Sequence, residues 1–155
     1  IRVIENQVHF NSNCCESARL CLHNINNDRI LMCNGALLLS PEILRNIDYN
    51  VSTVLCQQND DYKNFDVGVI ENGGILESMA VGVKTKLWSE VVYFSNRKAI
   101  NSLYSIVSNA EYKNRFLFEA INMMLKDNRL FVKENTDLRP VKIQNIKTLK
   151  RLTKI

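Results

Sequence analysis

The sequence predicts an α/β domain of three layers, in which helices flank a central, mainly parallel, four-stranded sheet. Strand-like and helical segments alternate along the chain from Ile30 onward, which is the order expected of this class. The strand-like segments are continuous apolar runs, typical of strands that are covered on both faces. With 155 residues, of which 46% are apolar and 23% charged, the composition excludes disordered, collagen-like and coiled-coil chains.

The first part of the chain predicts a short strand, a helix and a buried apolar segment. Residues 1–10 favour the strand. A helix is expected over 17–26, where apolar residues recur at helical spacing: Ala18, Cys21, Leu22 and Ile25. The run ILMCNGALLL at 30–39 predicts a buried strand or a tight hairpin around Asn34-Gly35.

The middle of the chain begins with a helix start at Ser40-Pro41-Glu42, where a capping hydroxyl precedes a proline at the first helical position. The segments NVSTVLCQ at 50–57 and DVGVI at 66–70 predict strands. A turn is expected at Asn72-Gly73-Gly74, followed by a helix over 75–81 that Gly82 ends.

The last part of the chain predicts a strand over 85–94 and helices over 97–108 and 112–126, then a final strand over 130–133. The helix over 112–126 has the most regular apolar face, formed by Leu117, Ala120, Ile121, Met124 and Leu125. We therefore expect one α/β domain over 1–138 and a separate basic segment over 139–155.

The positive charge is concentrated at the C-terminal end. The formal net charge is +4, and no acidic residue lies after Leu138, whereas six of the 20 cations do: Arg139, Lys142, Lys147, Lys150, Arg151 and Lys154. Such a segment attracts phosphates or an acidic partner. We predict that Lys147, Lys150, Arg151 and Lys154 contact a partner, possible classes being nucleic acid and protein; the alternative is a solvated basic face.

The five cysteines indicate a reducing compartment, because their number is odd and no CxxC pair is present. Their spacing relative to His9 and His23 does not match that of structural zinc sites, so we predict no metal site and no cofactor. No apolar run approaches the roughly 20 residues that span a bilayer, so we expect no membrane partner. A chain that begins with Ile1 is expected to be an excised part of a larger protein.

The order of segments from 30 to about 108 resembles a BRCT domain. The pieces that carry the resemblance are ILMCNGALLLS, PEILRNI, VSTVLCQ, DVGVI, ILESMAVGV and KLWSEVVYF. The resemblance implies a non-catalytic scaffold that binds a protein segment within a larger nuclear DNA-repair or chromatin protein, so the nucleus is favoured over the cytoplasm. The partner segment is expected at Ser40, where phosphopeptide-binding members have a Ser or Thr, and at Asn72, Gly73 and Gly74. The absence of a nucleophile–base pair likewise predicts that the domain is not an enzyme.

A second resemblance supports an alternative. Residues 66–83, DVGVIENGGILESMAVGV, are similar to part of the C-terminal half of nucleotide-sugar glycosyltransferases with two Rossmann domains. That resemblance implies that Asn72, Gly73 and Gly74 cradle the donor diphosphate at a helix N-terminus and that Glu77 bonds the ribose.

A third possibility is a nucleic-acid-binding domain of a viral polymerase-type protein. Aromatic and basic residues that could contact single-stranded nucleic acid occur together in one stretch: Tyr104, Tyr112, Arg115, Phe116 and Phe118. The same residues at helical spacing are also typical of a core.

Overall fold

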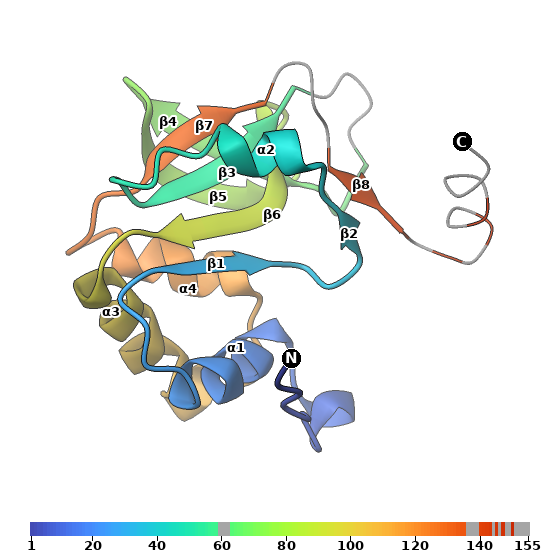
Figure 1. Cartoon of the computed structure of the whole chain (residues 1–155), viewed down its shortest axis with the longest axis vertical. Coiled ribbons are helices and arrows are strands. Elements are labelled where there is room, and N and C mark those ends of the chain that lie inside the picture. The colour runs from blue at the N-terminus through green and yellow to red at the C-terminus, as the bar shows by residue number, and fades with distance from the viewer. Residues whose placement is uncertain (59–62, 136–139, 144, 146, 148–149, 151–155) are drawn as a thin grey trace.

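The structure is a computed structural model that describes residues 1–58, 63–135, 140–143, 145, 147 and 150. Its centre is a sheet in which six described strands follow the order β1-β6-β3-β7-β5-β4 (Figure 1). The strands are β1 (Ile30–Cys33), β3 (Thr53–Gln57), β4 (Val67–Asn72), β5 (Ile75–Val81), β6 (Lys86–Phe94) and β7 (Phe131–Glu134). A small second sheet joins β2 (Leu37–Leu38) to β8 (Val141–Lys142).

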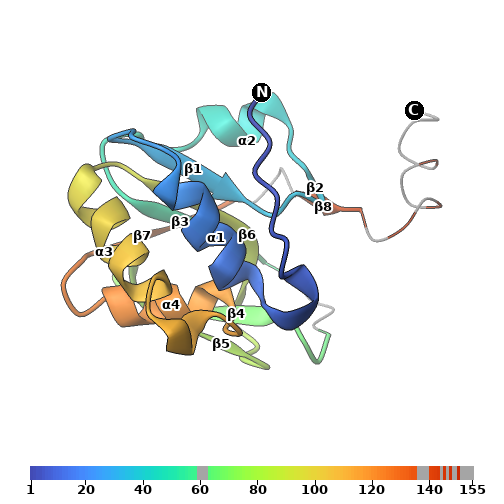
Figure 2. The same ribbon diagram turned by 90° about the horizontal axis from the view of Figure 1, so that it is seen from below.

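Helices cover the central sheet on both faces. One face carries α1 (Cys14–His23), α3 (Arg97–Val107) and α4 (Leu117–Met124), which lie in front of the strands in Figure 2. The other face carries the short α2 (Pro41–Arg45), and single 3-10 turns form η1 (His9–Asn11) and η2 (Ala110–Tyr112). The predicted α/β class with a central sheet and flanking helices is confirmed. The sheet has six strands rather than four, and β3–β7 is the one parallel pair among the described strands.

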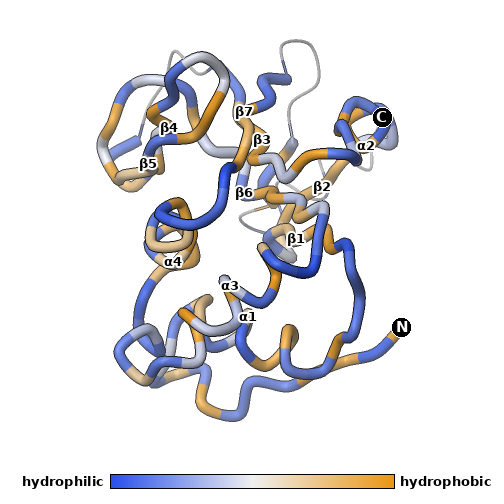
Figure 3. The backbone as a smooth tube through the Cα atoms, turned by 90° about the vertical axis from the view of Figure 1, so that its left-hand side faces the viewer, coloured by the Kyte–Doolittle hydropathy of each residue, from blue (hydrophilic) through white to orange (hydrophobic). Residues whose placement is uncertain are grey.

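Two hydrophobic clusters hold the layers together. The larger lies between the sheet and the three helices and contains Phe94, Leu103 and Ile121, all fully buried. The smaller packs Leu55 of β3 against Ile43 of α2. Because successive strand residues point to opposite faces, β3 supplies both clusters, and its first four residues are all buried. Figure 3 shows the hydrophobic residues of β3 and β6 at the centre of the fold.

Residues 75–81 form the strand β5, so the helix predicted there was wrong. Gly73 and Gly74 have φ of 59° and 79°, and they make the two-residue turn that joins β4 to β5 in a hairpin. The register passes from Glu71↔Leu76 to Ile70↔Ser78, so Glu77 is an extra, bulged residue on β5. This bulge places the buried Leu76 and Met79 three residues apart, which is the spacing that predicted a helix.

The sheet curls until its last strand meets β6. The second half of β6 pairs with β1, whereas its first two residues pair with β4 through Gly68↔Leu87 and Val69↔Lys86. A side chain at Gly68 would place its Cβ 2.0 Å from the backbone oxygen of Val83. Glycine at this position therefore permits the close approach of β4 to the chain leading into β6.

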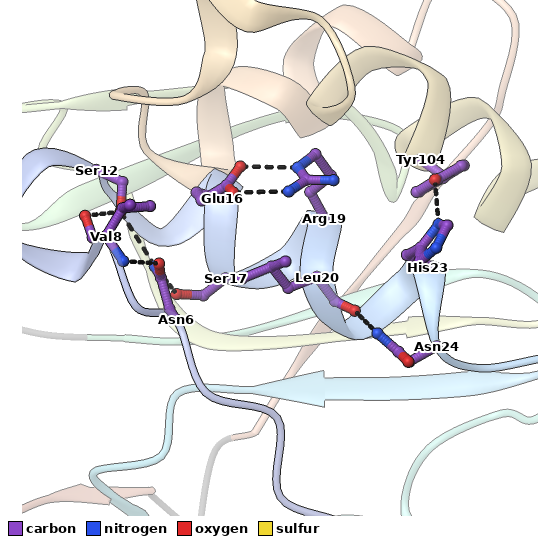
Figure 4. Close-up of polar contacts among 10 residues, drawn as sticks. All are labelled: Asn6, Val8, Ser12, Glu16, Ser17, Arg19, Leu20, His23, Asn24 and Tyr104. Atoms are coloured by element: carbon purple, nitrogen blue, oxygen red, sulfur yellow. Dashed lines mark hydrogen bonds and ion pairs between the residues drawn. The ribbon is translucent and has the colours of Figure 1, made fainter.

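The N-terminal segment packs near α1, and the strand predicted over 1–10 was wrong, because these residues form coil and the start of η1. Figure 4 shows the polar contacts in this part of the molecule. Arg19 donates two hydrogen bonds to the carboxylate of Glu16, at 2.8 and 2.7 Å. The Nδ1 atom of His23 lies 2.8 Å from the hydroxyl of Tyr104, which ties α1 to α3.

Candidate ligand-binding edge

Three strands of the central sheet end at the same edge. Because β1 and β3 are both antiparallel to β6, and β7 is parallel to β3, the carboxyl ends of β1, β3 and β7 point to the same edge. The end of β3 lies beside the start of β6, and the end of β1 lies beside the β6 residue Val91. In open α/β sheets, ligands bind at the carboxyl ends of the strands. Polar side chains occupy this place, and we call them the polar edge: Gln57, Ser89, Glu134 and Asn135.

Each residue of the polar edge has a buried side-chain atom that finds no hydrogen-bond partner within the described part of the chain. These atoms are Gln57 Oε1, Ser89 Oγ, Glu134 Oε1 and Asn135 Nδ2. Ser89 is 6% exposed and Asn135 is 4% exposed. Buried polar atoms are almost always partnered, since an unpartnered one costs about 1–3 kcal/mol. Gln57 follows Cys56 and Asn135 follows Glu134, so Gln57 and Asn135 lie on one face of this edge and Glu134 on the other. Unpartnered atoms at such an edge are available to a polar ligand.

A bulge in β6 sets the position of Ser89. The register with β3 passes from Leu55↔Val91 to Cys56↔Trp88, which leaves Ser89 and Glu90 as extra residues. Glu90 has φ of 57°, a left-handed conformation that is unfavourable for a residue other than glycine. Strained backbone of this kind is concentrated at functional sites.

A lysine joins two carboxylates beside the polar edge. The ammonium of Lys86 lies 2.6 Å from Glu71 Oε1 and 3.1 Å from Glu134 Oε2. Hydrogen bonds from this ammonium to Glu71 and Glu134 raise the pKa of Lys86 above its ordinary value, although partial burial opposes the shift. Lys86 therefore stays charged, and the second oxygen of Glu134 is left open.

A second lysine–carboxylate contact lies at the bulge. Glu90 accepts hydrogen bonds from the side chains of Asn34 and Lys142, one on each carboxylate oxygen. The backbone supports the same arrangement, since the amide of Asn34 donates to the carbonyl of Glu90 and that of Ile143 donates to the carbonyl of Ala36. These contacts bring β8 next to the end of β1.

A hollow of about 260 Å³ lies between the segment that precedes β4 and the segment that joins β5 to β6. Its described lining is Lys63, Asn64, Gly82 and Lys84, and the carboxylate of Asp66 accepts a hydrogen bond from the backbone amide of Lys63. Lys84 is two residues before Lys86, which places the hollow close to the polar edge along the chain. Another hollow, of about 290 Å³, lies beside the start of β5 and residues 125–129, away from this edge.

The residues predicted from the glycosyltransferase resemblance occupy the β4–β5 hairpin. Asn72, Gly73 and Gly74 form its turn, and Glu77 is exposed on the β5 bulge. No helix begins after Gly74, so the argument that a helix N-terminus attracts phosphate there was wrong. Binding by these four residues, whether of a nucleotide or of a partner, stays a prediction without that support.

The remaining predicted contact residues are spread over the molecule. Ser40 is the N-cap residue of α2, and its hydroxyl is buried without a partner among the described residues. Lys147 and Lys150 are exposed, whereas Arg151 and Lys154 lie outside the described residues. The polar edge itself was not predicted. Its signal in the sequence is a polar residue at the end of an apolar strand, as at Gln57 and Asn135.

Neither metal-ligand clusters nor membrane-spanning helices occur in the described part of the chain. No three or more His, Cys, Asp or Glu side chains gather there in a way that could hold a metal ion. None of the helices described is long and apolar enough to cross a bilayer.

No protein-family model matches the sequence, and no curated protein matches it. Solved structures do match the fold. One is the CTP:phosphocholine cytidylyltransferase from Streptococcus pneumoniae, with a TM-score of 0.78 and 14% identity over 99% of this chain and 68% of that one. A second is the inositol-1-phosphate CTP transferase from T. maritima, with a TM-score of 0.75 and 14% identity over 98% of this chain and 65% of that one. A third is a UDP-glucose pyrophosphorylase complexed with UDP-glucose, with a TM-score of 0.65 and 11% identity over 99% of this chain and 66% of that one. The chain thus spans about two thirds of their length.

These likenesses correct the functional prediction. The fold is the one found in nucleotidyltransferase structures, which contradicts both the prediction of a non-catalytic protein-interaction domain in a nuclear DNA-repair or chromatin protein and the prediction that the domain is not an enzyme. The BRCT resemblance receives no support, and the second helix that it implied is the strand β5. The alternative reading, a nucleotide-sugar domain, agrees better with these neighbours.

Proposed function

We propose that this chain is a nucleotide-sugar-binding domain of the nucleotidyltransferase type. The polar edge would hold the sugar, and the hollow between Lys63 and Lys84 would hold the phosphates. The observation that carries the proposal is the set of four buried side-chain atoms left without partners at the carboxyl ends of β3, β7 and the adjoining β6 bulge.

The chemistry of the polar edge suits hydroxyl groups. Gln57 Oε1 and Glu134 Oε1 accept hydrogen bonds, Asn135 Nδ2 donates, and Ser89 Oγ does either. A sugar hydroxyl is both a donor and an acceptor, so a sugar ring can satisfy such a mixed set. A phosphate cannot, because its negative charge would be repelled by the carboxylate of Glu134.

The hollow supplies the complementary charge. Its two lysines, Lys63 and Lys84, are exposed, and neither forms an ion pair within the described part of the chain. Lysine ammonium groups are common ligands of phosphate. The neighbouring structures support a nucleotide or nucleotide-sugar ligand, since one was solved with UDP-glucose and the others act, by their names, with CTP.

Thermal melting and calorimetry with UDP-glucose, CTP and glucose test the proposal. We expect UDP-glucose to raise the Tm of the full chain, since a ligand that binds only the folded state stabilises it. Gln57→Met should weaken UDP-glucose binding about fivefold to tenfold, the effect of losing one hydrogen bond of about 1 kcal/mol. The double substitution of Lys63 and Lys84 by Ala should weaken UDP-glucose and CTP but not glucose.

Glu77→Ala is the matched control. Glu77 is exposed on the β5 bulge, outside the polar edge, so this variant should bind UDP-glucose like the unchanged chain. Loss of binding in Glu77→Ala with normal binding in Gln57→Met would contradict the proposal and would favour the hairpin as the site. Absence of a Tm shift with all three compounds at millimolar concentration would also contradict it.

A further inference from the structure

Proteins that handle nucleotide phosphates commonly hold Mg²⁺ through one or two carboxylates and the phosphate oxygens. Within residues 1–58 and 63–135, the carboxylates near the polar edge are Glu71, Glu90 and Glu134. In each of them an oxygen is already in contact with a lysine ammonium, Lys86 for Glu71 and Glu134, and Lys142 for Glu90. These residues therefore do not fit a resident divalent cation. Their negative charges still require a positive charge nearby, and the lysine ammonium groups supply it.

The position of Lys86 is that of a bridging cation. Its ammonium contacts one oxygen of Glu71 and one of Glu134, and the three side chains are only 30%, 25% and 20% exposed. Without a positive charge between them, the partly buried carboxylates of Glu71 and Glu134 would repel each other. Cys56 lies on the same side of the sheet, and burial raises its pKa to about 12, so it stays a neutral thiol and supplies no negative charge.

We infer that the ammonium of Lys86 takes the place of a divalent metal ion between Glu71 and Glu134, so that the polar edge binds its ligand without Mg²⁺. The statement about the ligand rests on the proposed function, whereas the statement about Lys86 does not. Lys86 is a positioning residue in this arrangement. By fixing Glu134 Oε2, it leaves Glu134 Oε1 as the acceptor that faces a ligand hydroxyl.

The first test uses the ligand-free chain and the substitution Lys86→Met. This variant removes the ammonium and leaves two carboxylates, whose oxygens suit Ca²⁺ and Tb³⁺. Trp88 is the one tryptophan of the sequence and lies two residues from Lys86, so light absorbed by its indole can sensitise the luminescence of a Tb³⁺ ion bound there. We expect Tb³⁺ luminescence and a Ca²⁺-dependent rise in Tm in Lys86→Met, and neither in the unchanged chain.

Lys133→Met is the control for this test. Lys133 is exposed on β7, directly before Glu134, and forms no ion pair with the described residues, so its removal alters charge but opens no cation site. It should give no Tb³⁺ signal. Stoichiometric Tb³⁺ binding by the unchanged chain, or no gain in a folded Lys86→Met variant, would overturn the inference.

The second test measures the Kd of UDP-glucose for the unchanged chain under two conditions. One buffer contains about 5 mM Mg²⁺, on the order of what saturates ordinary Mg²⁺ sites, and the other contains EDTA. We expect the two values to agree within a factor of two. A tenfold loss of affinity in EDTA would overturn the inference while leaving the proposed function intact. If UDP-glucose fails to bind under both conditions, the proposed function fails, and the Tb³⁺ experiment still decides the role of Lys86.

Discussion

The helix-covered face of the sheet and its polar edge differ in whether their buried polar groups have hydrogen-bond partners. Under α4, the side-chain amide of Asn122 accepts a hydrogen bond from the Met79 amide and donates one to the Met79 carbonyl, at 2.8 and 2.7 Å. At the polar edge, Ser89 and Asn135 are more deeply buried, yet each keeps an atom without a partner in the described structure. The comparison shows that the buried polar groups under α4 are hydrogen-bonded within the fold, whereas those at the polar edge keep atoms available to a ligand.

The largest expected effect lies in the core. Leu103 of α3 is fully buried in the larger hydrophobic cluster. Leu103→Ala should lower the free energy of unfolding by about 3 kcal/mol, because it removes buried methyl groups and leaves a cavity. Urea unfolding measures the loss. Where the variant is still folded, its UDP-glucose affinity should be normal; a parallel loss of affinity would show that the two regions are not separate.

The next effect concerns the partnered amide. Asn122→Ala leaves both backbone groups of Met79 without their partners, which should cost about 2 kcal/mol in unfolding free energy. Asn101→Ala, at an exposed position of α3, is the control and should change stability by less than about 0.5 kcal/mol. Equal unfolding free energies for the two variants would mean that the Asn122 hydrogen bonds do not stabilise the fold.

A smaller effect should depend on pH. The hydrogen bonds and charge of Arg19 hold the pKa of Glu16 below its ordinary value, against the opposing effect of burial. Because the folded pKa is the lower one, the stabilisation is complete above the unfolded pKa of about 4.3 and is lost as the pH falls through the folded value. Glu16→Gln should therefore reduce the unfolding free energy at pH 7, and the difference from the unchanged chain should vanish near pH 2, as measured by urea unfolding. Glu111→Gln, at an exposed position without an ion pair in the described chain, should show no such trend.

The smallest effect on stability should come from the polar edge itself. Ser89→Ala removes an unpartnered hydroxyl, so the unfolding free energy should stay within about 0.5 kcal/mol or rise. UDP-glucose affinity should nevertheless fall about fivefold, as expected when one hydrogen bond to a ligand is lost. Calorimetry and urea unfolding on the same sample separate the two quantities. A large loss of stability would instead assign Ser89 to the core.

Much of the fold could be predicted from local patterns, and the exceptions have physical causes. The strands β3, β4, β6 and β7 and the helices α2 and α3 lie close to their predicted positions, because apolar runs and helix caps are local signals. The helix expected over 112–126 is shorter, since η2 and a turn precede α4. β5 was misread because the bulge at Glu77 gives a strand the apolar spacing of a helix.

The candidate site was much harder to predict than the fold. Gln57 and Asn135 lie 78 positions apart in the sequence, and they become neighbours only because β3 and β7 pair in parallel. Ser89 joins them through a bulge whose left-handed residue is a glutamate, so no glycine marks it. The contact between Lys86 and Glu134 likewise depends on strand pairing, which residue type and local spacing do not reveal.

The curling of the sheet has a consequence for how copies of the protein behave at high concentration. Unpaired strand edges are templates for intermolecular association. Here β4 returns to pair with β6, and the amide of Asn122 covers the backbone of β5 at Met79. The four-residue β1 is the outermost strand at the other end of the order. This arrangement pairs one end of the sheet and leaves only the short β1 as an outer edge among the described strands, and Gly68 permits it by admitting β4 to its place.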